Sequence, residues 1–180
     1  MHDGMSTARD PKPQLPDYPR FGGDHADASR AAFRVMGAGL DPDTITRATG
    51  LSPHLAHRKG QARPASPTSG TTYPPWPSGI WLLSSSMGLP EPGNDLDDHL
   101  SWLLDLLEPG ADRLRQLMAE QALTADFCCG YFKAQSNSSV RLRARTLGRV
   151  AALGADLVFE IYGEGADREL AYWLNAGPGA

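Results

Sequence analysis

The chain has 180 residues, of which 41% are hydrophobic, 21% charged and 8% aromatic, and its formal net charge is −4 at pH 7. This composition is close to the average of globular domains, and it excludes a collagen, a coiled-coil rod and a wholly disordered chain. The negative charge also argues against general nucleic-acid binding, because proteins that neutralise phosphates usually carry a basic excess.

The first 28 residues form a segment rich in proline, aspartate and glycine, with few aliphatic side chains. Such a segment cannot bury enough apolar surface to offset the entropy lost on ordering. We therefore expect a flexible tail over residues 1–28 and one domain over residues 29–162. The chain has no apolar run of signal-peptide type and none long enough to span a bilayer, so we expect a soluble cytoplasmic protein with no membrane contact.

A strand and a capped helix open the predicted domain. The short apolar run 31–36 indicates the strand. Asp41 is suited to be the N-cap of the helix and Pro42 its first residue, and Gly50 can supply the left-handed residue that ends it. This pattern predicts a helix over residues 42–49.

A long connection separates this helix from the second predicted strand. Residues 60–78 are rich in proline, serine, threonine and glycine. Loops of this length are uncommon in compact domains and are often functional. The apolar run that follows predicts a strand at 79–86.

Three helices and two strands are expected in the second half of the domain. Leucines recur at helical spacing across 95–107, and Pro109 interrupts the pattern, so residues 95–107 and 110–121 are expected to form two helices or one kinked helix. The remaining elements are a strand at 124–133, a helix at 146–153, a strand at 155–162, and a C-terminal tail, 163–180, with one turn of helix around 170–174.

The resulting order, β-α-β-α-α-β-α-β, predicts an α+β fold. A four-stranded, mainly antiparallel sheet packed against helices would bury the apolar faces of both. A ferredoxin-like or split βαβ arrangement satisfies this order.

Several segments, taken in this order, resemble a bacterial family of unknown function. They are residues 40–43, 49–51, 56–60, 79–85, 107–109 and 153–162. Over residues 30–162 the chain resembles the family catalogued as domain of unknown function 4279. The resemblance implies a small bacterial cytosolic α+β domain and supplies no catalytic residues; an immunity or partner-binding role is compatible with it by analogy alone.

Basic residues gather in two stretches, 47–63 and 133–149. No acidic residue lies within residues 44–90 or 127–155, whereas residues 91–108 between them are acidic. If the fold brought the basic stretches together, they would form one positive face; otherwise they are solvated surface charges.

The candidate ligand-binding residues are His57, Arg58, Lys59 and Trp81. The first three precede a glycine and the long loop, and arginine and lysine hold phosphate or carboxylate groups through charge-assisted hydrogen bonds. Trp76 and Trp81 offer a stacking wall for a base or ring. The competing interpretation places Trp81 in the core and the basic residues on the surface.

Residues 41–60 also have the pattern of a helix-turn-helix, in which a second helix would enter the major groove of DNA. Two positions fit this motif poorly, since Thr46 and Ala56 lie where the packing usually needs an alanine and a larger aliphatic residue, respectively. Gly60 also leaves the second helix very short. Nucleic acid is therefore not the expected partner.

No catalytic or metal-binding motif stands out in the sequence. Adjacent side chains on a strand point to opposite faces, so Cys128 and Cys129 do not suit an ordinary disulfide, and a cysteine nucleophile would need a nearby base. Asp97, Asp98 and His99 lie near a helix start, where the helix dipole favours acids, so a structural role suffices. We predict no catalytic residue, no metal and no cofactor.

These observations favour a non-enzymatic protein that binds a protein partner by charge complementarity, as an immunity or accessory protein would. Three alternatives stay open at this point. They are helix-turn-helix-like DNA binding through 41–60, binding of a small anionic ligand, and an enzyme activity that the sequence does not reveal.

Overall fold

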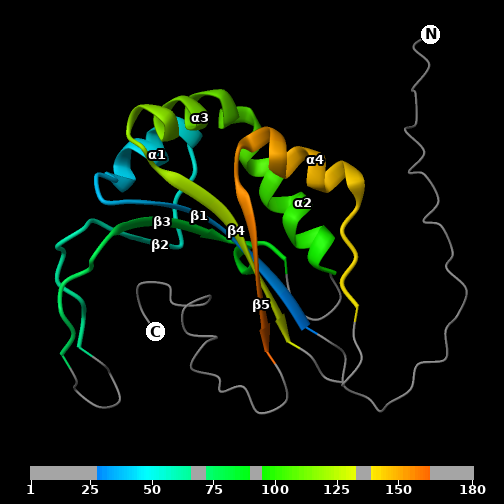
Figure 1. The fold of residues 1–180 in the computed structure, drawn as a ribbon, viewed down its shortest axis with the longest axis horizontal. Helices are drawn as coiled ribbons and strands as arrows, with labels where there is room; N and C mark the ends of the chain where they lie inside the picture. Colours follow the sequence, from blue (N-terminus) through cyan, green and yellow to red (C-terminus); the bar gives the residue numbers. More distant parts are fainter. Residues whose placement is uncertain (1–27, 66–71, 90–94, 133–138, 163–180) are drawn as a thin grey trace, which may run out of the picture.

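The computed structural model describes residues 28–65, 72–89, 95–132 and 139–162, which form one sheet with helices on one of its faces (Figure 1). In chain order the elements are β1 (Ala28–Gly37), α1 (Pro42–Thr49), β2 (Leu55–His57), β3 (Gly79–Ser84), a 3-10 turn (Ser85–Met87), α2 (Leu96–Leu107), a second 3-10 turn (Glu108–Gly110), α3 (Ala111–Glu120), β4 (Thr124–Phe132), α4 (Ala144–Leu153) and β5 (Asp156–Tyr162). The α+β class is thus confirmed.

The sheet has five strands in the order β2-β3-β1-β4-β5. Neighbours are antiparallel except β4 and β5, which run parallel and are joined through α4, so the sheet is mixed. The expectation of four strands was wrong by one. Part of the expected topology is present, because β1 and β2 are parallel with β3 between them, which is a split βαβ arrangement through α1.

The strand that the sequence did not predict is β2. Its three residues pair with β3, Leu55 opposite Leu82 and His57 opposite Ile80, and the amide of His54 donates to the carbonyl of Leu82. A segment this short carries no periodic signal, and its extended conformation comes from pairing with a strand more than twenty residues later. Since β2 occupies the position of the second helix, the helix-turn-helix interpretation of residues 41–60 was wrong.

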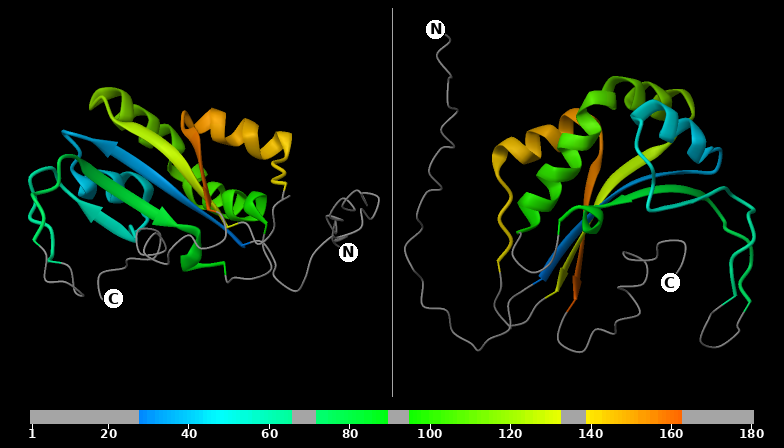
Figure 2. Two further views of the ribbon diagram at one scale, coloured as in Figure 1. Left: turned by 60° about the horizontal axis from the view of Figure 1, so that its bottom comes forward. Right: turned by 180° about the vertical axis from the view of Figure 1, so that it is seen from behind.

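The core lies between the sheet and the helices, all four of which cover the same face (Figures 1 and 2). Its centre is an aromatic group in which the Phe33 ring packs against Trp81 and Phe127, with ring centroids 6.4 and 5.1 Å apart. The five leucines of α2 that follow the helical spacing are 0–3% exposed. Burying each such side chain contributes about 1.5–3 kcal/mol.

The ends of α1 form as the sequence predicts. Asp41 accepts a hydrogen bond from the amide of Asp43, Pro42 is the first helical residue, and Gly50 ends the helix with a left-handed φ of 72°. The same chemistry starts α2, where Asp95 and Asp98 form a reciprocal capping box. These caps fix where each helix begins relative to the sheet.

Several predictions lie outside the described residues: the flexible N-terminal tail except for its last residue, which begins β1, the middle of the 60–78 connection, and the turn of helix at 170–174. Within the described ranges, no helix is both long and apolar enough to cross a membrane.

Candidate binding surfaces

The predicted ligand-binding residues occupy different environments. Trp81 is fully buried in the helix-side core, and its indole Nε1 donates to Thr46 Oγ1 at 3.0 Å. This hydrogen bond satisfies the polar atom of the indole and ties β3 to α1. Trp81 is therefore a core residue, as the competing interpretation expected.

The Arg58 side chain is engaged by the start of α1. Its Nη2 lies 2.5 Å from Asp41 Oδ1 and 2.8 Å from Asp43 Oδ2. These hydrogen bonds raise the pKa of Arg58, and the same contact lowers the pKa of Asp41. The neighbouring Lys59 is exposed and makes no ion pair in the part of the chain that the structure describes.

The connection between β2 and β3 begins and ends as a two-stranded ribbon. The amide of Gly60 donates to the carbonyl of Trp76 at 2.7 Å, and the amide of Trp76 donates to the carbonyl of Gln61 at 3.0 Å. We call residues 58–65 and 72–78 the hairpin arm. Figure 1 shows it extending beyond the sheet at the β2 side.

The base of the hairpin arm carries a stack of three side chains. His57 is 7% exposed, and its ring lies parallel to that of Trp76, with centroids 3.8 Å apart and planes 8° apart. The guanidinium carbon of Arg63 lies 4.0 Å from the Trp76 ring centroid, a cation–π distance. Sequence reasoning noted Trp76 but missed Arg63, because only the ribbon pairing brings it over the ring.

Burial first, and the Arg63 charge second, lower the pKa of His57, while backbone groups of Arg58 and Ser78 oppose this in part. His57 is therefore neutral near pH 7. Its Nδ1 and the Nε of Arg63 are buried and have no hydrogen-bond partner within the described residues. These two nitrogen atoms belong to the two side chains that contact the Trp76 ring. Buried polar atoms usually have a hydrogen-bond partner, and packing does not explain why these have none among the described residues.

In the described residues, the two basic stretches border opposite edges of the sheet. Three strands separate β2, which borders the first, from β5, which follows the second. In the second stretch, Arg149 binds Asp105 and Glu108 at 2.5 Å each, and this contact lowers the pKa of Glu108. Acidic residues of the preceding run thus pair with Arg149 of this stretch.

Asp97 is the most buried carboxylate of this group, at 1% exposure. It accepts hydrogen bonds from the backbone amide of Arg143 at 2.7 Å and from its Nη1 at 2.5 Å. Asp97 thereby fixes the start of α4 against α2, a structural role. Within the described residues, no group of three or more histidine, cysteine or acidic side chains is arranged to hold a metal.

The two thiols are free and buried on opposite faces of β4, Cys129 in the helix-side core and Cys128 beside Arg34 on the other face. Burial raises the pKa of each thiol to about 12. A protonated buried thiol is a poor nucleophile, so neither cysteine has the properties of a catalytic residue.

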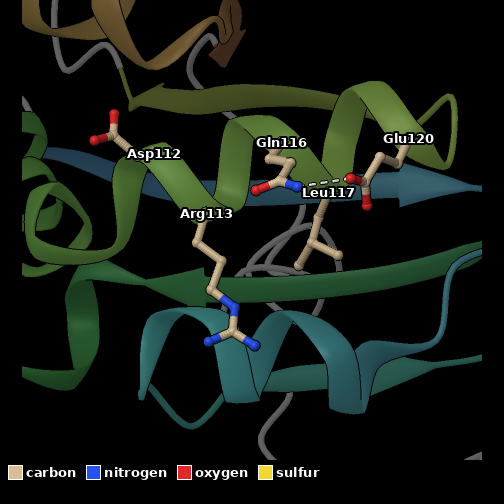
Figure 3. A pocket seen from close by; sticks show the side chains of 5 residues that line it. All are labelled: Asp112, Arg113, Gln116, Leu117 and Glu120. Atoms are coloured by element: carbon tan, nitrogen blue, oxygen red, sulfur yellow. Dashed lines mark hydrogen bonds between the residues drawn. The ribbon is translucent and has the colours of Figure 1, made fainter.

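A hollow on the outer side of α3 has the wrong lining for a ligand site. Asp112, Arg113, Gln116, Leu117 and Glu120 line it, and Figure 3 shows all five on this one helix. Gln116 donates to Glu120 at 2.7 Å within the helix. Four of the five side chains are exposed, so the hollow lacks buried polar groups that converge on one point.

Exposed apolar side chains gather at the other edge of the sheet. Phe159 and Ile161 of β5 are 44% and 65% exposed, and Leu147 of α4 is 41% exposed. β5 pairs only with β4 among the described strands, so the outer edge of its backbone has no strand partner there. The alternation of residues 155–162 predicted this strand. It did not predict that the apolar side chains of Phe159 and Ile161 would be exposed.

The fold defines a small α+β domain, in which a mixed five-stranded sheet is covered by helices on one face. Residues 27–164 match the family model described as Domain of unknown function (DUF4279), which covers more than half of the chain, so this protein belongs to that family. No curated protein and no solved structure matches it.

Proposed function

We propose that this domain is a non-enzymatic binding protein of the immunity or accessory type, and that it binds an acidic protein partner through the hairpin arm. The observation that carries the proposal is the chemistry of the arm. It combines the exposed cation of Lys59, which makes no ion pair among the described residues, and the ring of Tyr73, 47% exposed, with the ordered ring of Trp76. Tyrosine and tryptophan are enriched among the few residues that supply most of the energy at protein interfaces.

Order at the base of the hairpin arm supports the same conclusion. The stack on Trp76 and the two backbone hydrogen bonds fix the ring before any partner arrives. A preordered aromatic anchor loses less side-chain entropy on binding. The absence of acidic residues from 44 to 90 leaves the arm cationic, which favours fast association with an acidic surface.

The test is affinity capture of the tagged full chain from lysate of its own cells, at low and at moderate salt, followed by mass spectrometry. We expect one stoichiometric acidic protein that is retained by the unaltered chain and lost with Trp76→Ala or Lys59→Glu. Arg113→Glu is the matched control, because Arg113 is an exposed cation on α3, outside the arm. Loss of the partner with Arg113→Glu as well, or retention with both arm variants, would contradict the proposal.

A second candidate function is binding of a small anion at the same stack, favoured by the two unsatisfied nitrogen atoms of His57 and Arg63. A phosphate or carboxylate oxygen would accept a hydrogen bond from the Arg63 Nε–H, which always carries its proton. Titration with inorganic phosphate, followed by the imidazole NMR signals of His57, distinguishes the two functions. A saturable shift that Arg63→Gln abolishes supports the anion, and unchanged signals reject it.

A further inference from the structure

The outer edge of β5 combines two features that seldom persist in a monomer. The strand is seven residues long, and Figure 1 shows it in front of β4 with no described helix or strand crossing it. Its side chains on the helix side alternate as Leu157, Phe159 and Ile161. Long apolar edge strands expose unpaired backbone groups and act as templates for a further strand.

The helix that covers this end of the sheet, α4, does not cover the whole length of β5. Leu157 packs against the main core, which includes Val150 and Leu153 of α4. Farther along β5, exposure rises to 44% at Phe159 and 65% at Ile161. The apolar character of the strand therefore continues beyond the cover that its own chain provides.

We propose that β5 pairs antiparallel with β5 of a second copy of this chain, about a two-fold axis that passes beside Phe159. In this register Phe159 lies opposite Phe159 of the second copy, and Leu157 opposite Ile161. On the other face Val158 lies opposite Glu160. All seven residues of the strand take part, and every exposed apolar side chain of the strand meets another.

Charge selects this register among its neighbours. When the two-fold axis is normal to the sheet, residues directly opposite each other lie on the same face of the sheet. The register can therefore change only in steps that move the axis to the next residue of the strand. An axis at Val158 would place Asp156 opposite Glu160, and an axis at Glu160 would place that carboxylate opposite its own copy. Like charges directly opposite are destabilising, and of these three registers only the one about Phe159 avoids them.

The second copy is the occupant that the sequence of β5 favours, because the strand is complementary to itself. An isologous contact of this kind uses up both edges at once and closes as a dimer. Leu147 on α4 adds an exposed apolar side chain on the helix side of the sheet. The inference goes beyond the proposed function, since it concerns the edge opposite the hairpin arm.

The first test measures the mass of the full chain by light scattering and sedimentation at about 100 μM, a concentration that detects weak dimers. We expect twice the 19.4 kDa of one chain, and at least a tenfold weaker dimer with Ile161→Lys, which places a charge in the pairing. Met87→Lys is the control, because Met87 is an equally exposed apolar residue, at 55%, away from β5. A monomer at this concentration, or a dimer that Ile161→Lys leaves intact, overturns the proposal.

The register has a test of its own. Val158→Lys places a cation opposite Glu160 twice per dimer and is expected to tighten the dimer about threefold or more, whereas Val158→Glu should weaken it by a similar factor. If both variants weaken the dimer equally while circular dichroism shows both folded, the register about Phe159 is wrong.

Cross-linking gives a direct readout of the axis. Phe159→Cys brings two sulfur atoms together across the axis and is expected to yield a disulfide-linked dimer on mild oxidation. The native thiols do not interfere, since burial keeps both protonated. Met87→Cys, oxidised at the same concentration, should stay largely monomeric; equal cross-linking of the two variants would overturn the proposal.

Discussion

The two edges of the sheet differ in how they meet solvent. At one edge, β2 has three residues and continues into the hairpin arm, where polar and aromatic contacts hold Arg58, His57 and Trp76. At the other edge, β5 has seven residues and exposes Phe159 and Ile161. One edge is thus short and bordered by packed polar and aromatic side chains, and the other is long and apolar.

The difference shows that one sheet can offer two kinds of recognition. A short, polar edge with a fixed aromatic ring selects a partner by shape and charge. A long apolar edge binds through backbone hydrogen bonds, and its specificity comes from register. Each kind of contact fails under a different change, so the following predictions separate the two edges.

The largest effect on stability is expected from Asp97→Ala. Asp97 lies in α2 and holds the start of α4, the helix that leads into β5. This change removes the buried acceptor of the Arg143 amide and guanidinium and frees the start of α4. Because Arg143 is 46% exposed and can be resolvated, we expect a loss of about 2–3 kcal/mol in the free energy of unfolding, measured with urea.

Asp112→Ala is the control for this prediction, since Asp112 also pairs with an arginine but is 94% exposed. Its effect should stay within about 0.5 kcal/mol. Equal losses for the two variants would mean that the buried contact does not anchor α4.

A smaller effect is expected at the β2 side from Trp76→Ala. Loss of the ring contacts with His57 and Arg63 should cost about 1–2 kcal/mol. The pKa of His57, followed by NMR, should rise toward 6.5 because the imidazole becomes more exposed. Tyr73→Ala, at an exposed position of the same arm, should leave that pKa unchanged; a shift with both variants would contradict the role of the stack.

The smallest effect is a pH dependence confined to the β2 side. Because the pKa of His57 is lower in the folded chain than its ordinary value of 6.5, the unfolded chain binds more protons as pH falls below 6.5. The free energy of unfolding should therefore decrease with falling pH in this window and level off below the folded pKa. His57→Phe, which keeps a ring over Trp76, should remove this slope.

Carboxylates act in a separate, more acidic window. The pKa values of Asp41 and Glu108 are lowered by arginine partners from 3.8 and 4.5, so the stability they contribute is present above those values and lost as pH falls through the folded pKa values. A slope near pH 6 that survives His57→Phe would show that another group titrates there.

Local signals in the sequence predicted most of the elements. The cap and end of α1 depend on Asp41, Pro42 and Gly50, which lie within ten residues of one another, and the leucine spacing of α2 is a property of one helix. Such features form from neighbouring residues and can be read without knowing the fold. The resemblance to the family was likewise confirmed by the match over residues 27–164.

Contacts between distant residues could not be predicted in this way. The pairs Asp97–Arg143 and Arg34–Asp126 join residues 46 and 92 positions apart, and only the strand order brings them together. The same holds for β2, whose extended form is imposed by β3. The sequence singled out His57, which the structure stacks on Trp76, but it did not indicate the contact of Arg63 with the same ring.

The central position of β1 also determines how late in synthesis this strand can complete its pairing. β1 is the first described strand, yet one of its two neighbours in the sheet is β4. Arg34 of β1 can bind Asp126 of β4 only after 92 more residues have been synthesised. At about 5–20 residues per second, ribosomal synthesis separates these two residues by roughly 5–18 s. During that interval one edge of β1 has no strand to pair with, so the nascent chain depends on completing β4 quickly to avoid pairing with another molecule.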